Sequence, residues 1–201
     1  MNYLEMARGH DGMLRGMPEP AVVIAVYACV GPEVMVIGRT LHRFRPEGPF
    51  PCSVASGITA LPEGAVTTTA GVHYVVIAVA LEEDGQKDTQ RIFGALEHHR
   101  RLTLWAVDHQ EVEQRSIGAV GGAAFQTPQA VELSFDSQAI SASCTSDKWV
   151  GAVAWSIPSQ AKTEQELQQS PFHIPSEQLY RLPFRSPDGQ NDWTAVVSIR
   201  A

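Results

Sequence analysis

The chain has 201 residues, a formal charge of −7 and a pI near 5.4. A chain of this size buries roughly 70% of the surface that its unfolded form exposes, so a sizeable hydrophobic core is expected. The acidic balance argues against a non-specific grip on nucleic acid, because that grip depends on Lys and Arg neutralising phosphates.

The sequence lacks the signals of export and of membrane insertion. No apolar run reaches the roughly 18 to 20 residues that cross a bilayer, and the first residues lack the basic start and apolar middle of a secretory signal. Cys29, Cys52 and Cys144 are odd in number and show no C-x-x-C spacing, which favours neither a disulfide framework nor a zinc site. We therefore expect a cytoplasmic protein in a reducing compartment.

Strand signals recur along the chain at short intervals with turn residues between them. They cover residues 3–8, 21–30, 34–44, 52–55, 66–69, 72–81, 102–107, 117–120, 131–135, 139–144, 149–157, 178–184 and 192–200. Residues 21–30 are β-branched almost throughout, which predicts a central strand buried on both faces. This spacing predicts a mainly β protein, an antiparallel two-sheet β-sandwich in one domain over residues 1–201.

Two helices interrupt this pattern. The stronger signal covers residues 86–99, where Asp84 or Asp88 offers an N-terminal cap and Ile92 and Leu96 share one side. A weaker signal covers residues 163–169, whose Thr163 and Glu166 have the spacing of a capping box. We expect both helices to be insertions in the sandwich.

Residues 149–157 alternate bulky and small side chains with the period of a strand. This period places Trp149, Val153, Trp155 and Ile157 on one face. Because tryptophan rings bring a large apolar area that needs a packing partner, the face is expected to lie in the core, against Trp193 of the last strand.

The junctions between these strands resemble those of a C2 domain, a sandwich that binds lipids or proteins and, in many members, Ca²⁺. Residues 17–24, Met-Pro-Glu-Pro-Ala-Val-Val-Ile, resemble the family's Ser-Asp-Pro-Tyr step into an apolar strand. Residues 146–153 resemble its acidic, apolar, Ile-Gly-Glu step, and residues 179–182 with 192–199 resemble its last two strands. Residues 102–108 offer a second placement of the same step, and residues 46–100 are longer than the family needs.

The resemblance implies a calcium site at one end of the sandwich, where paired loops supply several carboxylates. The matching positions hold Asp11, Glu19, Asp108 and Asp147. These acids are few for an ion that takes six to eight oxygen ligands. The sequence therefore favours solvated loop residues over Ca²⁺ ligands, and it predicts no other cofactor.

The densest basic segment supplies the candidate binding residues Arg39, His42, Arg43 and Arg45. On a strand, the three arginines share one face, which suits an anionic membrane surface or an acidic protein partner. The alternative is an edge strand whose charge blocks unwanted pairing.

No motif of an enzyme is present, so no catalytic residue is predicted. The sequence has no G-x-S-x-G elbow, P-loop, G-x-G-x-x-G fingerprint or H-E-x-x-H pair. We expect a non-enzymatic binding or scaffold module that works without Ca²⁺. The alternatives are a structural subunit of a larger assembly, which would form an oligomer, and a hydrolase with a site built from loops.

Overall fold

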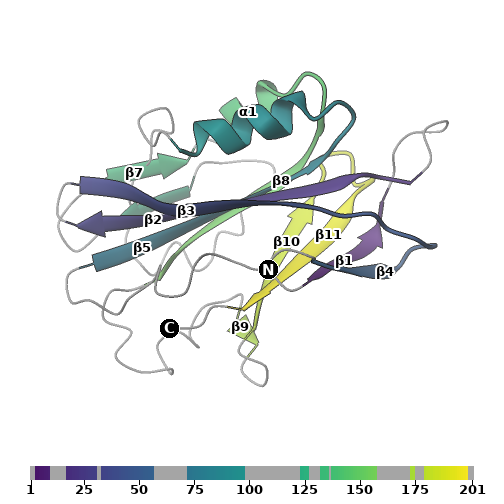
Figure 1. The fold of residues 1–201 in the computed structure, drawn as a ribbon, viewed down its shortest axis with the longest axis horizontal. Coiled ribbons are helices and arrows are strands. Elements are labelled where there is room, and N and C mark those ends of the chain that lie inside the picture. The colour runs from purple at the N-terminus through teal and green to yellow at the C-terminus, as the bar shows by residue number, and fades with distance from the viewer. Residues whose placement is uncertain are drawn as a thin grey trace.

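A computed structural model describes residues 3–9, 17–30, 33–56, 72–97, 123–126, 132–135, 137–157, 173–174 and 179–198. Within these residues the chain is mainly β and forms an antiparallel two-sheet sandwich, as the sequence predicts. Figure 1 shows the long strands of one sheet across the middle of the molecule, with helix α1 above them and the shorter strands of the second sheet below. No helix among the described residues is long and apolar enough to span a membrane.

The first sheet has four strands in the order β3-β2-β5-β8. These are β2 (Pro20–Val30), β3 (Glu33–Arg43), β5 (Val72–Glu82) and β8 (Lys148–Ile157). The side chains described on β2 and β5 are buried, with Ile24 alone half-buried. The predicted central strand at residues 21–30 is confirmed, and its residues 21–28, whose burial is described, are covered on both faces.

The second sheet has five strands in the order β4-β1-β11-β10-β9. These are β1 (Tyr3–Arg8), β4 (Cys52–Ala55), β9 (His173–Ile174), β10 (Leu179–Arg185) and β11 (Asp192–Ser198). A small third sheet pairs β6 (Ala123–Gln126) with β7 (Glu132–Phe135). The predicted strands at residues 66–69, 102–107 and 117–120 lie outside the described residues.

The core between the two large sheets is built from alternate side chains of their facing sides. Leu4 and Met6 of β1, Phe184 of β10 and Trp193 of β11 are at most 1% exposed and meet Val153 of β8. Burying each such side chain stabilises the fold by roughly 1.5 to 3 kcal/mol. The predicted contribution of Trp193 to the core is confirmed.

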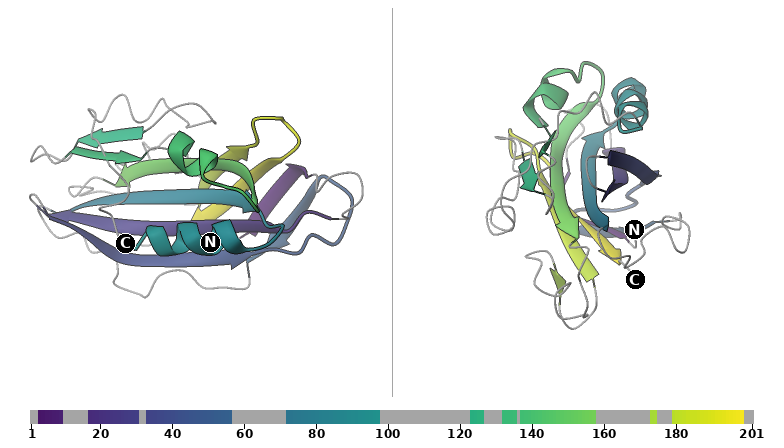
Figure 2. Two further views of the ribbon diagram at one scale, coloured as in Figure 1. Left: turned by 90° about the horizontal axis from the view of Figure 1, so that it is seen from above. Right: turned by 90° about the vertical axis from the view of Figure 1, so that its left-hand side faces the viewer.

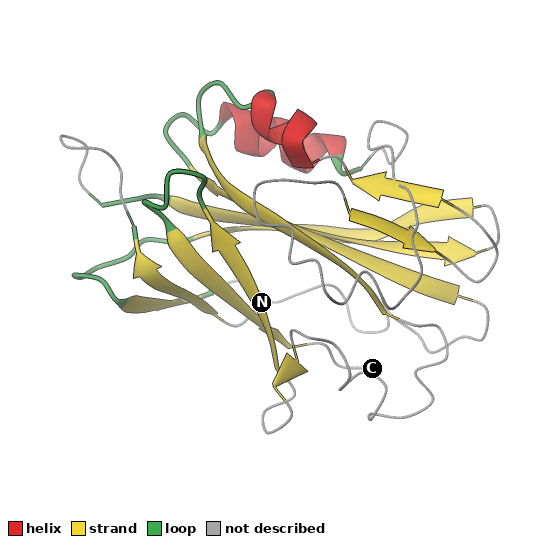
Figure 3. Ribbon diagram, turned by 180° about the vertical axis from the view of Figure 1, so that it is seen from behind, coloured by secondary structure: helices red, strands yellow, loops and turns green. Residues whose placement is uncertain are grey.

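Helices cover the other face of the four-stranded sheet (Figures 2 and 3). Helix α1 (Lys87–Ala95) and helix α3 (Ser137–Ala142) face a second core that contains Ile92 and Leu96. The helix predicted around residues 86–99 is therefore present and ends earlier. The helix predicted at residues 163–169 lies outside the described residues.

Helix α3 replaces the strand expected at residues 139–144, so that prediction is wrong. Ile140 and Cys144 lie four residues apart and both pack against the second core. A spacing of four residues is close to one turn of a helix. It is also a multiple of the two-residue period of a strand, so a short segment with few apolar residues fits both patterns.

A β-bulge in β8 changes which of its side chains share a face. Ala80 of β5 lies opposite Gly151, but the next residue, Leu81, lies opposite Trp149, so Val150 is an extra residue. Trp149 therefore joins the core under the helices, whereas Val153 joins the core between the sheets. The prediction that Trp149 and Val153 share a face is wrong, because one extra residue reverses the alternation.

The bulge leads to a prediction about Gly151. A Cβ at this position would lie 3.4 Å from the backbone nitrogen of Arg185 and 3.5 Å from the Cα of Phe184. Gly151→Val is expected to destabilise the protein by about 1 to 3 kcal/mol, because its methyl groups would push β8 away from β10. Urea unfolding measures this change in free energy.

Gly94 provides the matched control, because a Cβ at this helical position meets no atom within 4 Å. Gly94→Ala is expected to raise stability by roughly 0.5 to 1 kcal/mol. Equal effects of the two substitutions would contradict the close approach of β8 to β10.

Candidate functional site

The loop end of the sandwich is organised by Asp147, the residue that resembles a calcium ligand. Its side chain is 5% exposed and points at the start of helix α1. Oδ1 accepts hydrogen bonds from the backbone N–H groups of Gly85 (3.0 Å) and Gln86 (2.9 Å). Oδ2 accepts from the N–H (2.8 Å) and the hydroxyl (2.9 Å) of Thr89. Asp147 thus caps a helix that begins some sixty residues earlier in the sequence.

Asp88 makes the reciprocal contact from the first turn of α1. Its Oδ2 accepts from the successive backbone N–H groups of Thr145 (2.6 Å), Ser146 (2.6 Å) and Asp147 (3.0 Å). The Ser146 hydroxyl donates to the same oxygen at 3.1 Å, and Arg91 donates to Oδ1 at 3.3 Å. Asp88 and Asp147, with the segments 85–89 and 145–147 that they bind, are called the carboxylate clasp below.

The hydrogen bonds of the clasp favour the charged form of both acids. Burial alone would raise the pKa of Asp88, but the amides of Ser146, Asp147 and Thr145 hold it well below its usual value. Burial opposes ionisation of Asp147 too, and the groups donated by Thr89, Gly85 and Gln86 lower its pKa in the same way. The backbone amides therefore occupy the oxygens that a metal ion would need.

The other candidate calcium ligands do not join this cluster. Glu19 is exposed, and its backbone carbonyl accepts the N–H of Glu83 at 2.9 Å, which places it at the same end of the sandwich. Asp11 and Asp108 lie outside the described residues. Within the part of the chain that the structure describes, no three His, Cys, Asp or Glu side chains are arranged to hold a metal ion.

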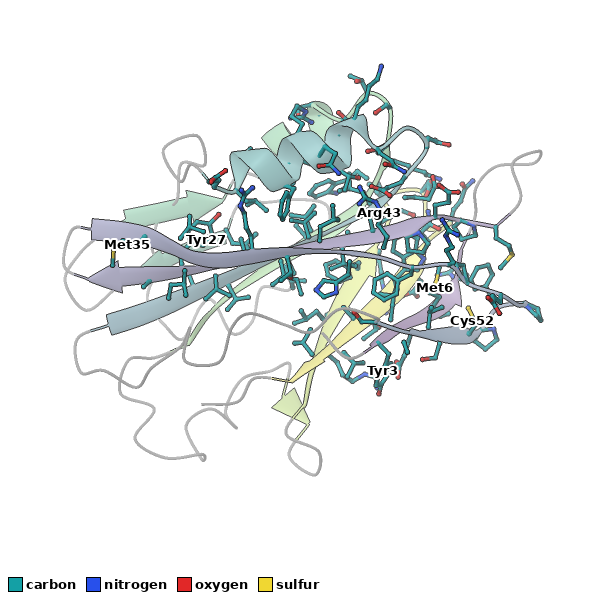
Figure 4. All side chains as sticks on the ribbon, in the orientation of Figure 1. Tyr3, Met6, Tyr27, Met35, Arg43 and Cys52 are labelled. Carbon is teal, nitrogen blue, oxygen red and sulfur yellow. The ribbon has the colours of Figure 1, made fainter. Side chains whose placement is uncertain are left out.

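The other end of α1 is fixed by strand residues. The Tyr27 hydroxyl of β2 donates to the carbonyl of Leu96 at 2.8 Å, and Figure 4 shows Tyr27 on the strand below the helix. Arg39 of β3 donates to the carbonyl of Phe93 and to Glu97, and its guanidinium lies 4.3 Å from the centre of the Phe93 ring. Cations at a helix C-terminus are stabilising. The predicted binding residue Arg39 is thus engaged in holding the helix.

Arg43 is engaged in a similar way at the end of β3. Its Nε and Nη2 donate to the two carboxylate oxygens of Glu83 at 2.7 and 3.0 Å. The side chain of Glu83 is 3% exposed, whereas that of Arg43 is 40% exposed, so the guanidinium is the surface member of the pair. Arg45 is exposed and forms no ion pair with any described residue. Much of the charge of the predicted basic face is therefore used inside the protein.

His42 lies on the opposite side of β3 from Arg39 and Arg43. It stands opposite Val22 of β2, which belongs to the core between the sheets, and it is 1% exposed. Its Nδ1 lies 2.8 Å from the hydroxyl of Ser56, just past β4, and its Nε2 lies 2.9 Å from the hydroxyl of Thr40. The imidazole therefore joins the edge of one sheet to the edge of the other.

The contact between Ser56 and His42 also has the form of a nucleophile beside a base. Burial lowers the pKa of His42 to about 4, far below the near-neutral value that suits a general base. The second ring nitrogen faces the Thr40 hydroxyl rather than an orienting carboxylate. These two properties suit a structural hydrogen bond better than catalysis.

The thiols described in this part of the molecule are poor nucleophiles. Burial raises the pKa of Cys144 to about 11, and burial also raises that of Cys52. Because the thiolate is the reactive form, both cysteines are expected to be inert at neutral pH.

Comparisons with protein-family models, with curated proteins and with solved structures found no match.

Sequence reasoning missed half of the clasp and most partners of the arginines. Asp84 or Asp88 is the cap that the sequence predicts, but the carboxylate of Asp88 binds residues 145–147 and Asp147 caps the helix. An acid in the first turn was the available signal, yet it cannot name a partner almost sixty residues away. Glu83, Tyr27 and Ser56 carried no signal, because their roles arise only when distant strands meet.

Removing Asp147 is expected to destabilise the protein strongly. Asp147→Ala leaves the N–H groups of Gly85, Gln86 and Thr89 without their acceptor. We expect a loss of about 2 to 4 kcal/mol in the free energy of unfolding, since hydrogen bonds to a charged acceptor are stronger than neutral ones. Glu47→Ala, at an exposed position, is the control and should change stability by less than about 0.5 kcal/mol. Similar values for the two variants would contradict the clasp.

His42 predicts a loss of stability in mildly acidic solution. The unfolded chain protonates this imidazole near pH 6.5, but the folded chain does so only near pH 4. Between these values the unfolded state binds more protons, so stability falls as the pH falls, by about 3 kcal/mol at most. Urea unfolding at pH 7, 5.5 and 4 measures the slope.

The variant His42→Gln isolates this contribution. Its stability should depend less on pH between 6.5 and 4 than that of the wild type. Both proteins should lose stability below about pH 4, where the unfolded chain binds protons at Asp88 and Asp147 while the clasp keeps both acids ionised. Equal slopes above pH 4 would show that His42 is not buried in its neutral form.

Proposed function

We propose that this chain is a non-enzymatic binding or scaffold module of C2-like form that acts without Ca²⁺, through contacts with a protein partner. The observation that carries this proposal is the carboxylate clasp. Asp147 stands where the C2 resemblance expects a metal ligand, and four donors of the protein itself occupy its two oxygens. The two-sheet antiparallel architecture supports the same reading.

A protein partner fits the charge distribution better than an anionic membrane. The chain carries a formal charge of −7, which opposes approach to acidic lipid. Two of the three arginines that would grip headgroups are paired with Glu97 and Glu83. Binding to a protein surface requires less positive charge than binding to an anionic membrane, because backbone and apolar groups also contribute to the contact.

Calcium is expected to leave the melting temperature unchanged. An ion that binds only the folded form must raise that temperature. Because we propose that Ca²⁺ does not bind, we expect the melting temperature to shift by less than about 1 °C in millimolar Ca²⁺. The matched control is the same melt in Mg²⁺. A clear rise with Ca²⁺ alone would overturn the calcium-independent mechanism.

Two further measurements separate the partner classes. Co-sedimentation with phosphatidylserine vesicles should not exceed that with phosphatidylcholine vesicles, and preferential pelleting with the anionic vesicles would favour a lipid ligand. A random dodecapeptide library displayed on phage should yield peptides that bind the intact chain. Failure to enrich any peptide would count against a module that binds extended segments of proteins.

A further inference from the structure

We propose that the outer edge of β3 is the binding surface of this module, and that it takes an extended segment of a partner protein as an added strand. The inference rests on the proposed function and names its partner: a segment with an apolar side chain placed against Leu41 and a carboxylate placed against Arg43.

Strand β3 is the longest edge strand among the described residues. Its eleven residues pair with β2 on one side and with no described strand on the other. The opposite edge strand of this sheet, β8, is shorter by one residue, with ten, and β6 lies near it. The edges of the second sheet are short, with four residues in β4 and two in β9. An added strand therefore finds its longest template at β3.

The backbone of β3 is oriented to receive such a strand. The N–H of Phe44 donates to the carbonyl of Pro20 at 2.8 Å, so residue 44 directs its polar groups toward β2. Because these groups alternate in an antiparallel ladder, those of Arg43, Leu41 and Arg39 turn away from β2, toward the free edge. The hydrogen bond from the N–H of Glu83 to the carbonyl of Glu19 agrees with this pattern. It shows that odd-numbered residues of β2 direct their polar backbone groups toward β5, which leaves the even-numbered ones for β3.

The side chains along this edge specify the chemistry of the added strand. Those of Arg39, Leu41 and Arg43 lie on the side of the sheet that carries α1. Leu41 is half-buried and extends the core beneath the helix, so an apolar side chain opposite it would bury further area. Figure 4 shows Met35 and Arg43 toward opposite ends of the strand.

The charged end of the edge favours a carboxylate. Arg43 presents its guanidinium at the surface, while the carboxylate that pairs with it, on Glu83, is buried behind it. Arg45 is exposed two residues further on. An acidic side chain at this end would accept charge-assisted hydrogen bonds from the arginines. An acidic side chain near Arg39 would instead be repelled by the half-exposed carboxylate of Glu97.

A second copy of the chain is the less favourable occupant. Two β3 edges paired antiparallel about Leu41 would set Arg39 of each copy against Arg43 of the other. Like charges directly opposite each other are destabilising in a sheet. The partner is therefore a different segment.

The test uses the intact chain and a dodecapeptide selected from the phage library. Leu41→Pro removes one outward N–H and no hydrogen bond to β2, and Leu41→Ala removes the same side chain while keeping that N–H. We expect Leu41→Pro to bind the peptide at least about tenfold more weakly than Leu41→Ala. Arg45→Glu, at an exposed position, should weaken binding several-fold at low salt.

Amide hydrogen exchange of the wild-type protein provides a second measurement that needs no variant to fold. In the free protein the amides of Arg39, Leu41 and Arg43 should exchange much faster than those of Thr40 and His42. Saturating peptide should slow the first set and leave the second unchanged. Slowed exchange confined to another surface, or equal affinities of the two Leu41 variants, would overturn the β3 site while leaving a peptide-binding module. Selection of no peptide would instead count against the protein segment as the partner in the proposed function.

Discussion

The carboxylate clasp, in which Asp88 and Asp147 each bind backbone amides of the segment that carries the other, holds the layer of helices on the sandwich. Helix α1 has nine residues, too few to be stable in water without packing and capping. Asp147 satisfies its first amides, and Asp88 binds three successive amides of the loop that leads into β8. The same contact therefore fixes the end of β5, the start of the helix and the start of β8. The placement of the second core depends on it.

The four-stranded sheet is buried on both faces, and this explains why its arginines serve the interior. The second sheet covers one face, and α1 and α3 cover the other. Arg39 donates to the carbonyl of Phe93 near the end of α1, and Arg43 neutralises the buried Glu83. The charges of β3 thus help to attach the helix layer at its open side. The proposed partner would bind the polar backbone groups on the free side of the outer strand, β3.

Much of the fold was predictable from local pattern, because burial on two faces demands continuous apolar strands. Residues 21–30 and 72–81 have this composition and form the central strands β2 and β5. Patterns that depend on counting residues were less secure. Because of the bulge at Val150, Trp149 and Val153 lie in different cores. Periodicity in one strand cannot predict such an extra residue, because it is defined by the pairing with the neighbouring strand.

The candidate site divides in the same way. The sequence by itself determined how few carboxylates stand at the positions of the expected calcium ligands and that basic residues recur between residues 39 and 45, since both are matters of composition and spacing. Only the tertiary structure decided what these groups do. Asp147 binds amides of residues 85–89, His42 turns to the opposite face from the arginines, and Glu83 comes to lie behind Arg43. These contacts join residues forty to sixty positions apart, or opposite sheets, and they form only when the strands that carry them are packed together.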